Sequence, residues 1–152
     1  MTMDTNLRLD AGQTLTNEAQ TTAINVEGGR FAIAHVRLGT LAANGDALNI
    51  RLQYQPDGTN WYTCPGGRFE QILGTHDSRY LKVPVFIPKN DTKGSLTPVR
   101  LEYELSENAT ESFVIAEAWL TPLLSLSPDA AVDVAQAEGF YVDQPKATVA
   151  LL

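Results

Sequence analysis

The clearest pattern in the chain is an alternation of apolar and polar residues over residues 48–54. The apolar positions are Leu48, Ile50, Leu52 and Tyr54, and the polar positions between them are Asn49, Arg51 and Gln53. Successive side chains of a strand point to opposite faces, so this period of two predicts a half-buried strand. Pro56 and Gly58 then favour a turn, because proline presets φ and glycine tolerates a positive φ. Trp61 and Tyr62 begin the returning strand, and we expect this hairpin at the centre of the fold.

Strand signals of the same kind recur along the chain. We expect further strands at residues 7–9, 21–26, 30–41, 68–73, 79–88, 97–105 and 112–120. Pro84 cannot donate a hydrogen bond to a neighbouring strand, so its strand is expected at a sheet edge or with a kink. Residues 97–120 predict one long hairpin. In its second strand, Phe113, Ile115 and Trp119 are expected to share a face.

About eight strands separated by turn signals predict an all-β fold, an antiparallel β-sandwich or jelly roll with extended terminal arms. Long helices do not alternate with the strands, which argues against an α/β fold. We divide the chain into an amino-terminal arm at residues 1–20, a β-sandwich domain at 21–121 and a carboxy-terminal arm at 122–152. The last arm is more apolar than a disordered tail. We expect it to dock on another subunit, with packing on its own domain or disorder as alternatives.

Size and charge exclude several classes of protein. A length of 152 residues is sufficient for one domain with a substantial core. The formal net charge of −7 argues against direct binding to nucleic acid, which needs a basic face, and against binding to an anionic membrane. No apolar run approaches the roughly 20 residues that span a bilayer. The first residues have neither the basic nor the apolar region of a secretory signal.

The sequence contains no pattern that predicts catalysis, a cofactor or a metal ion. Motifs of the G-x-S-x-G, Walker A, H-E-x-x-H and paired C-x-x-C types are absent, so we expect no enzyme activity. The two histidines are too few for a metal site; we expect His35 to be partly buried and neutral, and His76 to lie in a solvated loop. Cys64 is expected to be a small buried residue, with a reactive thiol or an intermolecular disulfide as alternatives.

Two sets of residues are candidates for contact with a ligand or partner. The aromatic residues Tyr54, Trp61 and Tyr62 would stack on sugars in a carbohydrate-binding module, or pack in a core or a subunit interface. The second set is apolar and lies in the predicted arms, where we expect contact with a neighbouring protomer or another protein. It comprises Leu7, Leu9, Leu123, Leu124, Leu126, Phe140, Tyr141 and Val142.

Three segments resemble small virion proteins of tailed bacteriophages. They are Leu52 to Tyr62 (LQYQPDGTNWY), Phe69 to Ile72 (FEQI) and Arg79 to Val83 (RYLKV), and the resemblance covers residues 30–120. In those proteins a similar hairpin recurs in β-sandwich domains that decorate the capsid or form tail parts. The resemblance implies a non-enzymatic structural protein of the capsid cement (decoration) class. A tail protein, a head–tail adaptor and a carbohydrate-binding module of a tail protein are the alternatives.

The resemblance also implies partners and a location. Such decoration proteins commonly form trimers at the threefold sites of the capsid, and their arms commonly reach neighbouring subunits. We therefore expect a homo-oligomer, with a homotrimer favoured, that clamps adjacent subunits of the major capsid protein. It would lie on the capsid surface of the virion after synthesis in the cytoplasm of the host bacterium.

Overall fold

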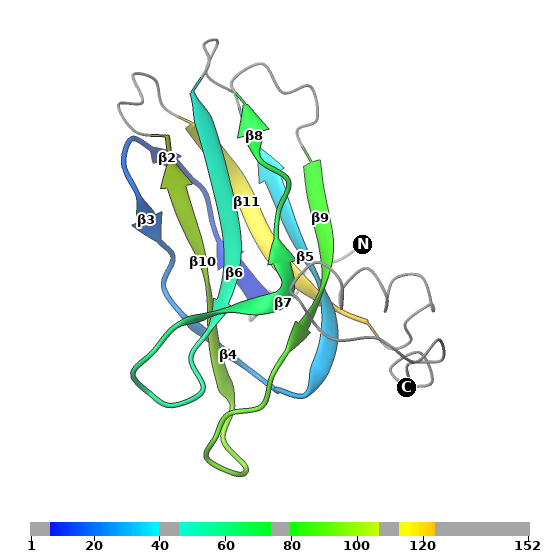
Figure 1. The fold of residues 1–152 in the computed structure, drawn as a ribbon. Coiled ribbons are helices and arrows are strands. Elements are labelled where there is room, and N and C mark those ends of the chain that lie inside the picture. The colour runs from blue at the N-terminus through cyan, green and yellow to red at the C-terminus, as the bar shows by residue number, and fades with distance from the viewer. Residues whose placement is uncertain (1–6, 40–45, 74–79, 107–112, 124–152) are drawn as a thin grey trace, which may run out of the picture.

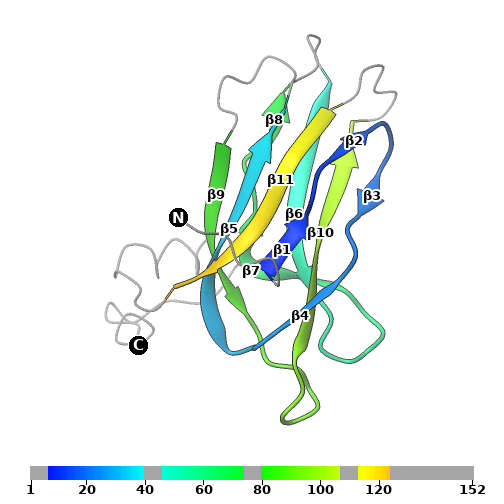
Figure 2. The same ribbon diagram turned by 180° about the vertical axis from the view of Figure 1, so that it is seen from behind.

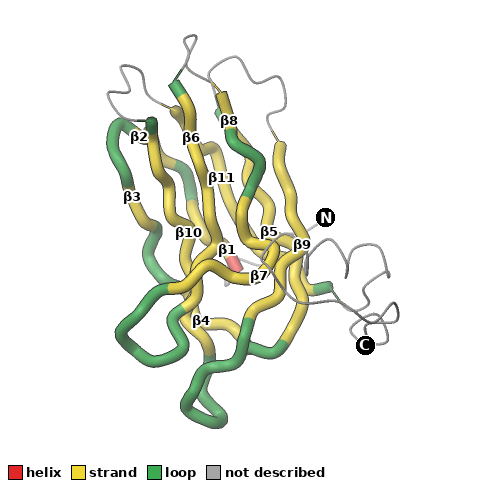
Figure 3. The backbone as a smooth tube through the Cα atoms, in the orientation of Figure 1, coloured by secondary structure: helices red, strands yellow, loops and turns green. Residues whose placement is uncertain are grey.

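The computed structural model describes residues 7–39, 46–73, 80–106 and 113–123, which form two antiparallel sheets packed face to face (Figure 1). Sheet A contains β1 (Arg8–Asp10), β2 (Gln13–Leu15), β5 (Arg30–Leu38), β9 (Tyr80–Ile87) and β11 (Phe113–Pro122). Sheet B contains β3 (Ala19–Gln20), β4 (Ile24–Val26), β6 (Ala47–Tyr54), β7 (Tyr62–Arg68), β8 (Ile72–Leu73) and β10 (Thr97–Leu105). The predicted antiparallel β-sandwich is confirmed, and strands make up most of the described chain (Figure 3).

The strand order shows how each sheet is built. Sheet A has the order β1-β11-β5-β9, with β2 also paired to β11, and Figure 2 shows β11 between β1 and β5. Sheet B has the order β3-β10-β6-β7, with β4 paired to β10 and β8 paired to β6. The prediction of one hairpin over residues 97–120 is wrong, because β10 and β11 belong to different sheets. β10 is flanked by β6 on one side and by β3 and β4 on the other, so it has no free edge for β11.

The predicted hairpin of residues 48–62 is present in sheet B. β6 pairs with β7 antiparallel, with Tyr54 opposite Tyr62, and it lies between β10 and β7. Gly58 has a φ of 74°, as a glycine turn position requires. Asp57 Oδ1 accepts a hydrogen bond from the backbone N–H of Asn60 at 2.7 Å, which closes the turn locally.

The predicted amino-terminal arm belongs to the sandwich from β1 onward. β1 and β2 pair with β11, β3 pairs with β10, and Leu9 and Leu15 are buried in the core. The predicted boundary at residue 20 therefore falls within the sandwich, because strands of two or three residues are too short to show a period of two. β11 ends at Pro122, one residue beyond the predicted limit of the domain. The predicted carboxy-terminal arm after Leu123 lies outside the described residues.

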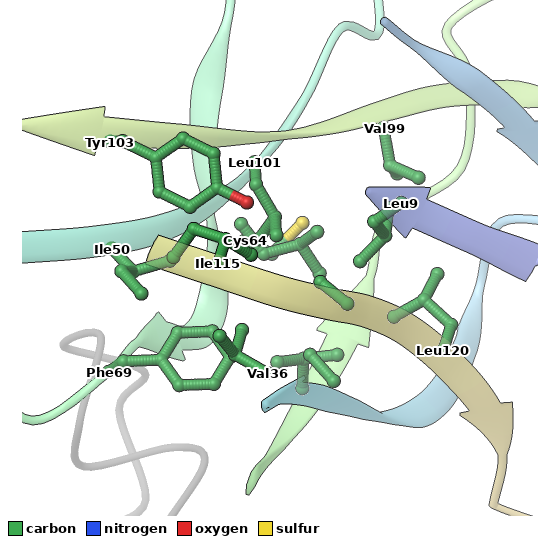
Figure 4. Close-up of a cluster of buried hydrophobic side chains, with 14 of the residues drawn as sticks. Leu9, Val36, Ile50, Cys64, Phe69, Val99, Leu101, Tyr103, Ile115 and Leu120 are labelled. Atoms are coloured by element: carbon green, nitrogen blue, oxygen red, sulfur yellow. The ribbon is translucent and has the colours of Figure 1, made fainter. Parts of the chain in front are cut away.

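The core lies between the inner faces of the two sheets (Figure 4). Its fully buried side chains include Val36, Phe113 and Ile115 from sheet A and Ile50, Leu101 and Tyr103 from sheet B. Burying an apolar side chain of this size contributes roughly 1.5–3 kcal/mol. Cys64 is also fully buried, as expected for a small apolar residue.

The edges of the described sheets are short or interrupted by proline. β9 forms one edge of sheet A, as its Pro84 predicts, and β7 on the same side of sheet B contains Pro65. The opposite edges consist of β1, β2, β3 and β4, each of two or three residues. Short strands and prolines discourage pairing with strands of other molecules. We therefore expect partners to bind through the sheet faces, the ends of the sandwich or the terminal segments.

A buried hydrogen bond joins the two sheets. The hydroxyl of Tyr103 on β10 donates to Asp10 Oδ2 on β1 at 2.6 Å. Asp10 also accepts hydrogen bonds at 2.8 Å from the backbone N–H of Gly12 and from Gln13 Nε2. Burial, followed by the adjacent carboxylate, raises the pKa of the Tyr103 hydroxyl, so this hydroxyl remains a donor. The bond fixes the position of β1 against sheet B.

Replacing Tyr103 with phenylalanine should destabilise the fold. The Tyr103→Phe variant keeps the ring but leaves the buried Asp10 carboxylate with one donor fewer, which costs about 1–3 kcal/mol. Urea denaturation measures the free energy of unfolding. Tyr62→Phe is the matched control, because Tyr62 is 47% exposed and its variant should stay within about 0.5 kcal/mol of the parent chain. Equal stability of the two variants would contradict the role of the cross-sheet bond.

Candidate functional site

Strand register gathers aromatic and cationic side chains on the outer face of sheet A. Val36 on β5 points into the core, so its neighbours in the strand point outward. The register places His35 on β5 between Trp119 on β11 and Lys82 on β9. We call this surface the sheet A face. It comprises Arg8, Phe31, Ile33, His35, Arg37, Tyr80, Lys82, Pro84, Phe86, Glu117, Trp119 and Thr121.

Trp119 reaches this face because β11 contains a bulge. Phe113 and Ile115 are buried in the core, but the pairing of β11 with β5 shifts register between Ile115 and Glu117. An extra residue in one strand reverses the faces beyond it. Leu120 therefore points into the core, and Trp119 points outward. The expectation that Trp119 shares a face with Phe113 and Ile115 is wrong for this reason.

Three rings are nearly parallel at the centre of the sheet A face. The ring centroids of His35 and Trp119 are 4.8 Å apart, with an angle of 4° between the planes. Tyr80 lies parallel to both, with its centroid 5.8 Å from that of His35 and 6.1 Å from that of Trp119. The guanidinium carbon of Arg37 lies 5.3 Å from the Trp119 centroid, a cation–π distance. The rings and the cation hold one another in fixed positions.

Both ring nitrogens of His35 make hydrogen bonds. Its Nδ1 lies 2.6 Å from the Tyr80 hydroxyl, and its Nε2 lies 2.8 Å from Thr121 Oγ1. A neutral imidazole donates through one nitrogen and accepts through the other, and hydroxyl groups can serve as partners for both. Burial, followed by the positive charge of Lys82, lowers the pKa of His35. The expected burial of His35 is confirmed, and the lowered pKa favours its neutral form.

The outer face of sheet B carries polar groups that pair with one another. The guanidinium carbon of Arg100 lies 4.1 Å from the ring centroid of Trp61, and Arg100 Nε donates to Gln53 Oε1 at 2.9 Å. Gln53 Nε2 donates to Glu102 Oε2 at 3.3 Å, and Glu102 forms an ion pair with Arg51. We call Trp61 with its Arg100 partner the Trp61 platform. It is a fixed aromatic surface with amide and carboxylate groups beside it.

The three predicted aromatic contacts divide into two groups. Tyr54 and Tyr62 are register partners whose ring centroids lie 5.8 Å apart at an angle of 41°. Tyr54 is half-buried, and burial raises the pKa of its hydroxyl, whereas Tyr62 is exposed. Trp61 instead packs on Arg100. The structure therefore gives each ring a role within the chain and leaves part of Tyr62 and Trp61 accessible to a ligand.

The predicted apolar contacts lie in different places. Leu9 is a core residue of its own domain, because it is only 4% exposed. Leu7 is half-buried against the core, and the Leu123 N–H donates to the Phe31 carbonyl oxygen at 3.3 Å. The remaining candidates, Leu124, Leu126, Phe140, Tyr141 and Val142, lie outside the described residues.

An apolar groove lies where β11 ends. It has a volume of about 400 Å³, and its lining includes Leu7, Val26, Phe31, Ile87, Leu120 and Pro122. An ion pair at 2.8 Å between Glu27 and Arg30 borders it. The carboxy-terminal segment therefore leaves the sandwich beside apolar surface.

The described part of the chain contains no group of three or more histidine, cysteine, aspartate or glutamate side chains arranged to hold a metal ion. Within the same residues, no helix is long and apolar enough to cross a membrane.

The lowered pKa of His35 predicts a pH-dependent stability. Below its ordinary pKa of about 6.5, the unfolded chain binds a proton at this position more readily than the folded chain. The contribution of His35 to the free energy of unfolding should therefore rise with pH up to about 6.5 and stay constant above that pH. Urea denaturation across this range should show a smaller rise for His35→Gln than for the control His76→Gln. Identical pH profiles for the two variants would contradict this assignment.

Comparisons with known proteins identify no family for this chain. No known family matches the chain, and no curated protein matches it. Among solved structures, the chain is similar to the Clostridium thermocellum endo-1,4-beta-D-xylanase 10B, in its CBM22-1 and GH10 modules complexed with xylohexaose. The TM-score is 0.46 and the identity is 10%, with 82% of this chain and 29% of that chain covered.

Proposed function

We propose that the protein is a capsid decoration protein of a tailed bacteriophage, a non-enzymatic component that clamps adjacent subunits of the major capsid protein. One observation carries this proposal. A sandwich with protected edges is combined with an apolar groove at the point where the carboxy-terminal segment leaves it. A clamp needs a rigid scaffold and extended contacts, and it needs no catalytic group.

The sandwich supplies the rigid scaffold. Its core is continuous between the two sheets, and the Tyr103–Asp10 bond joins them. At one end, the loops that follow β6 and β9 are fixed to each other, because the Asp91 N–H donates to the Pro56 carbonyl oxygen at 2.9 Å. A surface that is already ordered loses little conformational entropy when it binds. A preformed surface of this kind suits the proposed docking onto a shell.

The carboxy-terminal segment supplies the extended contact. Fully stretched, residues 124–152 would reach roughly 100 Å, which is enough to cross from one subunit to the next. A clamp across such a junction adds buried area where a shell under pressure from packaged DNA is weakest. We propose that the protein acts as a homotrimer, because several arms that bind together need only modest strength individually.

Binding to capsid shells should depend on the carboxy-terminal segment. The full chain, co-expressed with the major capsid protein of the same phage genome, should co-sediment with assembled shells. A chain that ends at Pro122 should bind at least about tenfold more weakly, because it loses the arm contacts. A full-length variant with Phe140→Ser and Tyr141→Ser keeps the chain length, and we expect it to bind weakly as well, because it loses apolar contacts of the same segment. Failure of the full chain to co-sediment would contradict the proposal.

A carbohydrate-binding module is the second candidate, and the Trp61 platform favours it. Flat aromatic rings with hydrogen-bonding side chains beside them suit the apolar and polar faces of a sugar ring. On a glycan array, binding by the full chain should be lost in Trp61→Ala and kept in Tyr80→Ala, which changes an aromatic residue on the other sheet. An array without any bound glycan would remove this candidate.

A further inference from the structure

The sheet A face is positively charged although the whole chain carries a formal net charge of −7. Arg8, Arg37 and Lys82 lie on it. Among the described strands, Glu117 is the acidic residue that the register places beside them, 3.7 Å from Arg8. Arg37 and Lys82 are both exposed. The face is therefore suited to a partner that carries negative charge.

Two nitrogen donors at this face lack an acceptor. Arg8 Nε and Trp119 Nε1 are buried and have no hydrogen-bond partner among the described residues. Arg8 and Trp119 are opposite each other in the pairing of β1 with β11. Buried donors in folded proteins almost always have a partner. An acceptor is therefore expected from beyond the described strands, and the surrounding cations favour a carboxylate.

The charged residues of segment 124–152 are mostly acidic, so its charge is opposite to that of the sheet A face. Its acidic residues are Asp129, Asp133, Glu138 and Asp143, and its single basic residue is Lys146. It also contains Phe140 and Tyr141, so it can bring apolar rings together with carboxylates. This combination matches a face that carries both aromatic rings and cations.

The end of β11 brings this segment to the margin of the sheet A face. The Leu123 N–H donates to the Phe31 carbonyl oxygen at 3.3 Å. Phe31 packs against Phe86, with 5.0 Å between the ring centroids, and both rings are only half-buried. The segment thus begins beside the aromatic part of the face, and its length is sufficient to cover the cationic part.

We infer that the segment 124–152 docks on the sheet A face. Its carboxylates lie beside Arg8, Arg37 and Lys82, and its aromatic residues pack near Phe31 and Phe86. Exposed ion pairs are weak individually, so the apolar contacts supply most of the affinity and the charges select the segment and its orientation. Because salt screens exposed charges, docking should weaken as ionic strength rises.

Zero-length cross-linking of the full chain tests this inference. A carbodiimide joins a lysine amine to a carboxylate only where the two are in contact, and mass spectrometry identifies the joined peptides. We expect Lys82 to be joined to Asp129, Asp133, Glu138 or Asp143. Lys93, which is exposed in the loop between β9 and β10, is the internal control and should be joined to these carboxylates several-fold less often.

Charge-reversal variants distinguish specific docking of segment 124–152 from random contact between lysines and its carboxylates. Arg37→Glu should reduce the Lys82 cross-links several-fold, whereas Lys93→Glu should leave them unchanged. Circular dichroism checks that both variants remain folded. Equal cross-linking of Lys82 and Lys93, or Lys82 cross-links that survive both Arg37→Glu and high salt, would overturn the inference.

Mixing chains labelled with ¹⁴N and ¹⁵N identifies the copy that supplies the segment. Cross-links of mixed isotope composition mean that a neighbouring copy supplies it, and cross-links of uniform composition mean that the same chain does. Either result supports docking, and the absence of both kinds of cross-link overturns it. The isolated chain is sufficient for this experiment, so its outcome is independent of whether the protein decorates a capsid.

Discussion

The pairing of β5 with β11 is the constraint on which the rest of the structure depends. The register of these two strands decides which residues of sheet A face the core and which face outward. It turns Val36 into the core and places His35 against Trp119 on the outer face. Side chains alternate with a period of two, so a slip of one residue would exchange the core face with the outer face. The bulge between Ile115 and Glu117 is therefore essential, since without it Trp119 would point into the core and Leu120 would point outward.

Local chemistry accounts for the parts of the fold that could be predicted from the sequence. The alternation over residues 48–54 and the turn at Asp57 and Gly58 predict the β6–β7 hairpin, and Pro84 predicts an edge strand. The outward set on β5, which includes His35 and Arg37, also follows from the period of two. Each of these features depends only on residues close together in the sequence.

Long-range pairing accounts for the parts that could not be predicted. β10 and β11 are neighbours in the sequence, but they lie in different sheets because β10 is already paired on both sides. β1 to β3 are too short to show a period. Trp119 and Tyr80 join His35 only through the register of three strands, so the sheet A face could not be found from any single segment. The bulge in β11 carries no local sequence signal that we can identify.

The functional proposal follows from where binding surface is available. The described edges are short or contain proline, which leaves the two outer faces and the groove beside Phe31 as surfaces for partners. On the outer face of sheet B, charged side chains form ion pairs and hydrogen bonds with neighbours on the same face. On the outer face of sheet A, Arg37 and Lys82 are exposed to solvent. The proposed clamp role rests on a rigid sandwich with one such face and on an acidic, partly apolar terminal segment.

Cryo-electron microscopy of the purified virion is the measurement that tests the proposed capsid location most directly. If the protein decorates the capsid, the map contains a β-sandwich on the outer surface of the shell, over the contacts between subunits of the major capsid protein. Its density repeats with the symmetry of the shell. Density confined to the tail or to the head–tail junction, or a shell without this sandwich, would contradict the proposal.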